Sequence, residues 1–171
     1  LRRDSSKGTL LHVLDRTVTP MGSRLLRRWV GYPLLDLGEI QRRLAAVATL
    51  REGRMTREAV REAFREMYDL ERLNGRISLG RANARDLAAL RASVRRIPGI
   101  KEALAGSASE LLEEIGTELD PLEDVAAVID EAVRDEPPIS LREGGIIREG
   151  YSDELDELIR ITRDGKGWIA D

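Results

Sequence analysis

The sequence predicts an all-α protein, a multi-helix bundle of antiparallel neighbours with one short β-hairpin near residues 139–148. Apolar residues recur at three- and four-residue intervals along most of the 171 residues, which is the period of an amphipathic helix. The composition favours the same class, since 42% of the residues are hydrophobic, 35% are charged and only 4% are aromatic. The connections between the periodic segments are short, which places consecutive helices side by side in antiparallel order.

Capping residues and proline mark the helix starts in the first part of the chain. A short apolar helix is expected over 9–17. Thr19 followed by Pro20 is typical of a second start, with a side-chain cap and a proline at the first helical position. Asp36 and Glu39 have the spacing of a capping box and begin a third helix.

The middle of the chain combines helical spacing with breaks at glycine and proline. We expect Thr56 to cap a fourth helix that continues through Leu73. A turn or broken region over 75–81 follows. Asn83 has a carboxylate three residues later, so it is expected to cap the next helix, which stops near Pro98.

The last third contains two further helices and the strand signal. Asp120, followed by proline, is expected to open one helix, and the proline pair at Pro137 to end it. Within 139–148 the double glycine that begins at Gly144 lies between short apolar pairs, which predicts a small β-hairpin. Ser152 is expected to cap the last helix.

The residue types present exclude several classes of protein. The sequence has no cysteine, which excludes disulfides, thiolate metal sites and a cysteine nucleophile and fits the reducing cytoplasm, where we expect the protein. No apolar run approaches the roughly 18 residues that a membrane helix needs, so we expect no membrane contact. The net charge of -3 is unlike that of a domain whose main task is to grip nucleic acid, which is usually strongly basic.

The sequence has no catalytic or cofactor-binding motif. His12 is the only histidine and lies among apolar residues, so we expect a packed or half-exposed side chain rather than a catalytic or zinc-binding one. No phosphate-binding GxxxxGKS/T or GxGxxG motif occurs, and the acidic run over 113–124 lacks the spacing of a calcium loop. We therefore expect a chain that is not an enzyme and that holds no cofactor or metal.

The segment from Asp69 to Arg72 is the sharpest local pattern of charge. Asp69 and Arg72 are three residues apart and can pair on a helix, with Glu71 between them. Arg76 and Arg81 follow close by, which predicts a network of half-buried ion pairs that fixes geometry. The alternative is an exposed salt bridge worth about 0–1 kcal/mol.

A second set of arginines follows at helical spacing. Arg81, Arg85, Arg91 and Arg95 are placed to share one face, which would suit weak contacts with DNA phosphates. Acidic residues are interspersed throughout, and no aromatic residues accompany the arginines to stack on bases. Ion pairs between helices are therefore the alternative role for these arginines.

Three segments together resemble a known family. They are Tyr68–Leu90, Asp15–Trp29 and Pro137–Asp156. Each resembles part of the helical core of the MutS family of DNA mismatch-repair proteins, and they occur in the family's order at about its spacing. The resemblance covers nearly all of the chain and implies the same all-α fold.

The resemblance implies a mechanical role. Residues 1–171 would form a single helical core and lever domain, truncated before the DNA clamp, with 152–171 as the start of the lever helix that leads to the clamp. The chain begins without Met, so we expect a piece of a longer protein. That parent would be a homodimer that binds ATP and Mg²⁺, binds mismatched double-stranded DNA and interacts with MutL, whereas the fragment would be a monomer.

The resemblance assigns no catalytic residue, because the family's ATPase motifs do not occur here. The only phenylalanine, Phe64 in Ala-Phe-Arg-Glu, lies within the expected fourth helix and not in the N-terminal domain that carries the family's Phe-x-Glu wedge. Two alternatives stay open. The parent would then be a MutS relative that acts on recombination intermediates, or the chain would be a free-standing helical adaptor that binds partner helices.

Overall fold

The computed structural model describes the backbone of residues 8–170 and, except at 141 and 163–170, their side chains. Within this range the chain is mostly helical and contains no sheet, which confirms the predicted fold class. In chain order the helices are α1 (Leu10–Leu14), α2 (Pro20–Gly31), α3 (Leu37–Glu52), α4 (Arg54–Arg65), α5 (Leu70–Ser78), α6 (Ala84–Val94), α7 (Ile97–Leu104), α8 (Glu110–Glu118), α9 (Glu123–Ala132) and α10 (Asp153–Ala170), with a 3-10 turn at Leu141–Glu143 between the last two.

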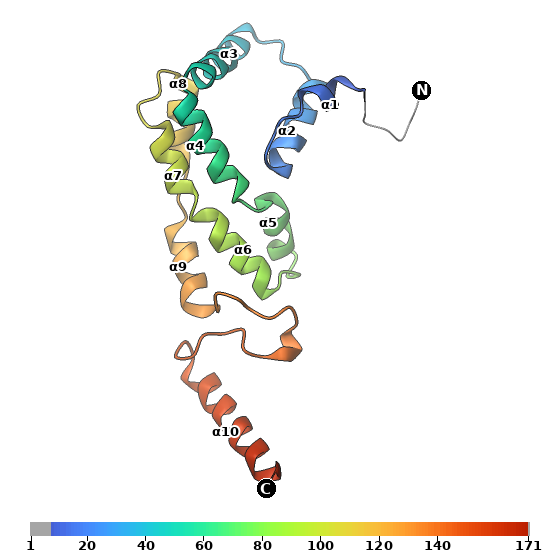
Figure 1. The fold of residues 1–171 in the computed structure, drawn as a ribbon, viewed down its shortest axis with the longest axis vertical. Helices are drawn as coiled ribbons and strands as arrows, with labels where there is room; N and C mark the ends of the chain where they lie inside the picture. The colour runs from blue at the N-terminus through green and yellow to red at the C-terminus, as the bar shows by residue number, and fades with distance from the viewer. Residues whose placement is uncertain (1–7, 171) are drawn as a thin grey trace.

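Two hydrophobic clusters divide the packed helices (Figure 1). The upper body comprises α3, α4, α7 and α8, and its buried residues are Ala46, Ile100, Leu104 and Leu112. The lower body comprises α6 and α9, whose buried cluster is Ala84, Ile129 and Val133, together with α5, which packs on α6 outside that cluster. The α1–α2 pair stands beside this column, and α10 extends from its foot (Figure 1).

Several helix starts match the prediction because their capping bonds are local. The Thr19 hydroxyl accepts the backbone N–H of Gly22 at 3.0 Å, with Pro20 in the first turn of α2. Asn83 and Asp86 form a full capping box, in which each side chain accepts the other's backbone N–H. Such bonds satisfy N–H groups that have no partner inside the helix.

The predicted fourth helix is wrong in both its start and its length. Thr56 lies inside α4, which begins at Arg54 and ends at Arg65 instead of reaching Leu73. The chain leaves the helix because the Tyr68 N–H donates to the Ser93 hydroxyl at 2.9 Å rather than to a helical carbonyl. A separate helix, α5, then starts, so most of the expected break over 75–81 is helical up to Ser78.

Proline and glycine act differently from expectation around α7 and α8. Pro98 lies in the first turn of α7 instead of stopping a helix, since a proline there removes no intrahelical hydrogen bond. Gly116 is buried inside α8, where a Cβ atom would lie 3.1 Å from the Cβ of Leu104. The next helix, α9, begins at Glu123, after Leu122 in a left-handed conformation, so Asp120 lies just before it.

The predicted β-hairpin over 139–148 is corrected to a single antiparallel bridge. Gly144 and its neighbour both have positive φ, as a tight turn of this kind requires. Ile147, however, pairs with Val133 at the end of α9, and the residues before the glycines form the 3-10 turn. The reason is burial, because Ile146 packs on the lower cluster while Ile139 is exposed.

No helix among residues 8–170 is both long enough and apolar enough to span a membrane.

Candidate functional site

Asp69 occupies the N-cap of α5 and joins two parts of the fold. Its carboxylate accepts the backbone N–H of Arg72 at 3.2 Å, which satisfies one of the free donors at the start of the helix. The same carboxylate receives two hydrogen bonds from the guanidinium of Arg24 on α2, at 2.8 Å and 2.7 Å. Asp69 is therefore both a local cap and the partner of a residue 45 positions earlier.

The Arg24 guanidinium bridges two carboxylates on α5. Its Nε donates to Glu71 at 2.8 Å while its other nitrogens hold Asp69 in a two-pronged contact. The planar fork of arginine matches such carboxylate geometry, which lysine does not reproduce. We call Arg24, Asp69 and Glu71 the α2–α5 clamp.

The electrostatics of the clamp follow from these bonds. The hydrogen bonds from Arg24 lower the pKa of Asp69 below its usual range, and burial opposes that effect in part. The Asp69 side chain is 16% exposed, whereas Arg24 and Glu71 are more open to water. The clamp therefore lies at the surface, where its geometry counts for more than its contribution to stability.

The expected pair between the side chains of Asp69 and Arg72 is corrected. Arg72 contributes its backbone N–H to Asp69, and the charge of its exposed side chain helps to lower the pKa of Asp69, but no direct ion pair joins the two described side chains. Arg76 instead reaches forward and pairs with Asp86 at 2.8 Å, which connects α5 to the capping box of α6. It also approaches the carbonyl of Arg81 at 3.4 Å.

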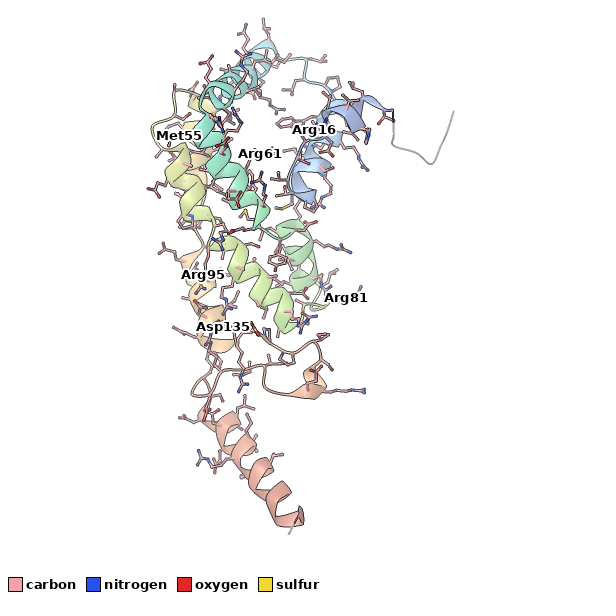
Figure 2. The ribbon with its side chains drawn as sticks, viewed as in Figure 1. Arg16, Met55, Arg61, Arg81, Arg95 and Asp135 are labelled. Atoms are coloured by element: carbon pink, nitrogen blue, oxygen red, sulfur yellow. The ribbon has the colours of Figure 1, made fainter. Side chains whose placement is uncertain are left out.

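A second set of ion pairs connects α6 to α9. The buried Arg91 donates to Asp130 at 2.9 Å and contacts Asp135 at 3.1 Å. Arg95 also pairs with Asp130, and Arg148 pairs with Asp135 at 2.7 Å. Arg95 and Asp135 lie along the α9 side of the column (Figure 2). We call these five residues the α6–α9 network.

The four arginines proposed to contact phosphate therefore differ in surroundings. Arg91 and Arg95 belong to the α6–α9 network, and Arg85 donates to the carbonyl of Pro137 at 3.1 Å. Within the described residues, Arg81 alone of the four has an exposed guanidinium with no carboxylate or carbonyl partner. The structure thus contains the interhelical ion pairs of the alternative interpretation, and phosphate contact stays a prediction.

Polar contacts also attach the α1–α2 pair to the other helices. No side chain in α1 or α2 is buried. Hydrogen bonds from Ser23, and then from Thr17, lower the pKa of Asp15 and fix the turn between the two helices. Arg61 of α4 donates to the carbonyl of Arg16 across the space between them (Figure 2). Arg43 lies over the ring of Trp29, 4.1 Å from its centroid.

The described side chains contain no obvious centre for chemistry. No group of three or more metal-binding side chains occurs among them. His12 is exposed on α1, where its backbone N–H donates to Thr9. What the arrangement does is to connect helices that are distant in sequence through arginine and carboxylate groups.

Comparison with known proteins decides the family. A family model for MutS domain III matches residues 1–164. The chain belongs to the MutS domain III family. Three similar relatives, each described as DNA mismatch repair protein MutS, come from Symbiobacterium thermophilum, Alkaliphilus oremlandii and Bacillus subtilis, at 50%, 49% and 43% identity. Each match covers 99% of this chain but only 19–20% of the relative.

The sequence did not predict the ion-pair partners of the charged residues in this MutS domain III chain. Arg24 was not among the candidate residues, and the carboxylates of Asp130 and Asp135 carried no signal of their own. Most of these ion pairs join residues 35 to 47 positions apart, as between Arg95 and Asp130 or Arg24 and Glu71, whereas Arg148 and Asp135 are 13 positions apart. Helical spacing relates only neighbours within a helix, so a single sequence contains no signal for these pairs.

The lowered pKa of Asp69 predicts how Asp69→Asn changes the stability of this MutS domain III chain with pH. A carboxylate with a lowered folded pKa adds stability above its unfolded pKa, near 3.8, and loses that contribution as pH falls through the folded value. Asparagine still caps α5 but cannot form the ion pair. The variant should therefore be less stable than wild type at neutral pH, and the difference should vanish in strong acid. Urea unfolding across this range measures it, and a difference independent of pH would contradict it.

Proposed function

We propose that the chain is the structural core and lever segment of a MutS-type mismatch-repair ATPase, and that it couples a DNA clamp to the ATPase domain. In this proposal residues 1–171 form one helical core and lever domain, and 152–171 begin the lever helix that leads to the clamp. The segment itself would be monomeric and would do no chemistry.

The observation that carries the proposal is the presence of two sets of ion pairs between helices. The α2–α5 clamp joins helices 45 residues apart, and the α6–α9 network joins helices 39 residues apart through Arg91 and Asp130. A lever needs rigid elements whose relative orientation is defined, and directional arginine–carboxylate contacts supply that definition. In this proposal these contacts transmit an applied force from one helix to the other.

The last helix supports the assignment of a lever. It has no extensive packing against another described helix. Leu158 and Ile161 are both exposed on it. Its start is nevertheless well defined, because Ser152 accepts the Leu155 N–H and Asp156 accepts the Gly150 N–H at 2.7 Å.

The properties of the whole protein follow as further parts of the proposal. The relatives are named for DNA mismatch repair, which favours that role over action on recombination intermediates. The parent would accordingly bind mismatched double-stranded DNA, use ATP and Mg²⁺ in a domain outside this segment, form a homodimer, interact with MutL and act in the cytoplasm. A free-standing adaptor finds less support, because the family match runs through residues 1–164.

The test is Asp69→Ala in the full-length protein. We expect DNA stimulation of ATP hydrolysis to fall by about 2- to 30-fold, the range that corresponds to changes of ~0.5–2 kcal/mol in coupling. Turnover without DNA should be unchanged, because no part of the ATP site lies in this segment. Steady-state hydrolysis with and without mismatched duplex measures both quantities.

Glu58→Ala is the matched control. It also removes an arginine–carboxylate pair, that of Glu58 with Arg54, but this pair lies within one turn of α4 and joins no two helices. Stimulation should therefore stay at the wild-type level. Full stimulation in Asp69→Ala, or an equal loss in both variants, would refute a coupling role for the clamp.

A further inference from the structure

The upper and lower bodies are packed as separate units. The upper and lower hydrophobic clusters share no residue. The extensive helix pairings among the described residues are likewise internal to each body: α4 with α7, α7 with α8, α3 with α8 and α3 with α4 above, and α6 with α9 and α5 with α6 below. Cohesion within each body therefore exceeds cohesion between them.

The chain crosses between the bodies three times, each time outside the assigned helices, and at Arg95 and Arg96 the backbone keeps right-handed helical angles. The crossings are residues 66–69 between α4 and α5, 95–96 between α6 and α7, and 119–122 between α8 and α9 (Figure 1). Hinges in proteins are usually such short segments at the ends of elements, since they can absorb changes of φ and ψ without breaking a helix. We call these three segments the joint.

The contacts at the joint include the end of α6, next to the 95–96 crossing. Ser93 and Val94, at the end of α6, are both fully buried there. The Ser93 hydroxyl donates to the Ala89 carbonyl at 2.8 Å and accepts the Tyr68 N–H at 2.9 Å, so one side chain ties the 66–69 crossing to the end of α6. Glu66 and Arg96 add an exposed ion pair at 2.7 Å between the 66–69 and 95–96 crossings.

The third crossing is held differently. Leu119 packs against the upper cluster, and the Lys101 ammonium donates to its carbonyl. Leu122 then adopts a φ of 52°, a left-handed conformation that costs a residue with a Cβ atom about 1–2 kcal/mol. Because this conformation is strained, the connector can adopt another one when the bodies move.

We propose that this joint is a hinge, about which the upper and lower bodies rotate as rigid units with Ser93 as the pivot. The motion belongs to the chain itself and does not depend on what the segment is attached to. In a parent protein it would give the column two orientations, so that a force on α10 moves the lower body relative to α3 and α4.

Pulsed electron–electron double resonance, which measures the distance between two spin labels, tests the hinge on the 171-residue chain. The sequence has no cysteine, so two introduced cysteines carry the only spin labels. The pair Ala48→Cys with Ala127→Cys spans the joint, from exposed positions on α3 and α9. The pair Ala48→Cys with Glu102→Cys stays within the upper body, also at exposed positions. We expect a wider distance distribution across the joint than within the upper body.

Two variants at the pivot sharpen the test. Ser93→Ala should widen the distribution across the joint further and leave the distribution within the upper body unchanged. Ser109→Ala is its control, because Ser109 is also buried but its hydroxyl has no hydrogen-bond partner in the described structure. Arg96→Gln, at a half-exposed site, gives a second readout if Ser93→Ala fails to fold. A cross-joint distribution as narrow as the internal one, and unchanged by Ser93→Ala or Arg96→Gln, would overturn the hinge.

Discussion

Replacing Arg91 with alanine is expected to lower the free energy of unfolding by about 2–3 kcal/mol, because it removes one partner of a buried ion pair. The Arg91 side chain is 8% exposed and binds both Asp130 and Asp135. Its loss leaves Asp130 with Arg95 alone and Asp135 with Arg148 alone, and empties the space that its aliphatic stem fills. The value lies below the largest effects of this kind because both carboxylates retain some contact with water.

Arg95→Ala is the matched control for this prediction. Arg95 binds the same Asp130 but its side chain is 53% exposed, so removal should cost about 0–1 kcal/mol. Denaturant unfolding of the chain measures both variants under the same conditions. Equal costs for the two arginines would show that burial does not set the worth of this network and would refute the prediction.

Gly116→Val should also destabilise the chain, by about 2 kcal/mol, through overpacking. A Cβ atom at Gly116 would already lie 3.1 Å from the Cβ of Leu104, and both residues are buried where α7 meets α8. The two further methyl groups of valine would force the helices apart. Thermal or urea unfolding measures the loss.

Gly99→Ala provides the contrast. Gly99 lies in α7, and no heavy atom lies within 4 Å of a Cβ placed there. Alanine should therefore stabilise the chain by ~0.5–1 kcal/mol through the reduced freedom of the unfolded state. If both glycine replacements changed stability in the same direction, close packing between α7 and α8 would not explain the role of Gly116.

The sequence predicted the features of the fold that depend on near neighbours. The starts at Thr19 and Asn83 are correct because each cap bonds within three residues. The predicted fourth helix is longer than α4, because the end of α4 depends on Ser93, which lies 25 residues beyond Tyr68. The β-hairpin was mispaired for a similar reason, since Val133 was outside the segment that showed strand character.

The candidate site divides in the same way. Asp69 and Glu71 were identified from local charge, and the structure places both on Arg24. The partner itself was beyond the reach of helical spacing, and so were the partners of Arg91 and Arg95 on α9. Only the fold brings these residues together, because a charged side chain in isolation is compatible with solvent, a neighbouring helix or a ligand.

The coupling role of the α2–α5 clamp is tested most directly by a double-mutant cycle in the full-length protein. The cycle compares Arg24→Ala, Asp69→Asn and the double variant by DNA stimulation of ATP hydrolysis, and asparagine preserves the cap of α5. If the contact between Arg24 and Asp69 transmits the signal, each single variant loses stimulation and the double variant loses no more than Arg24→Ala alone. Additive losses, or wild-type stimulation in both single variants, would contradict the coupling role.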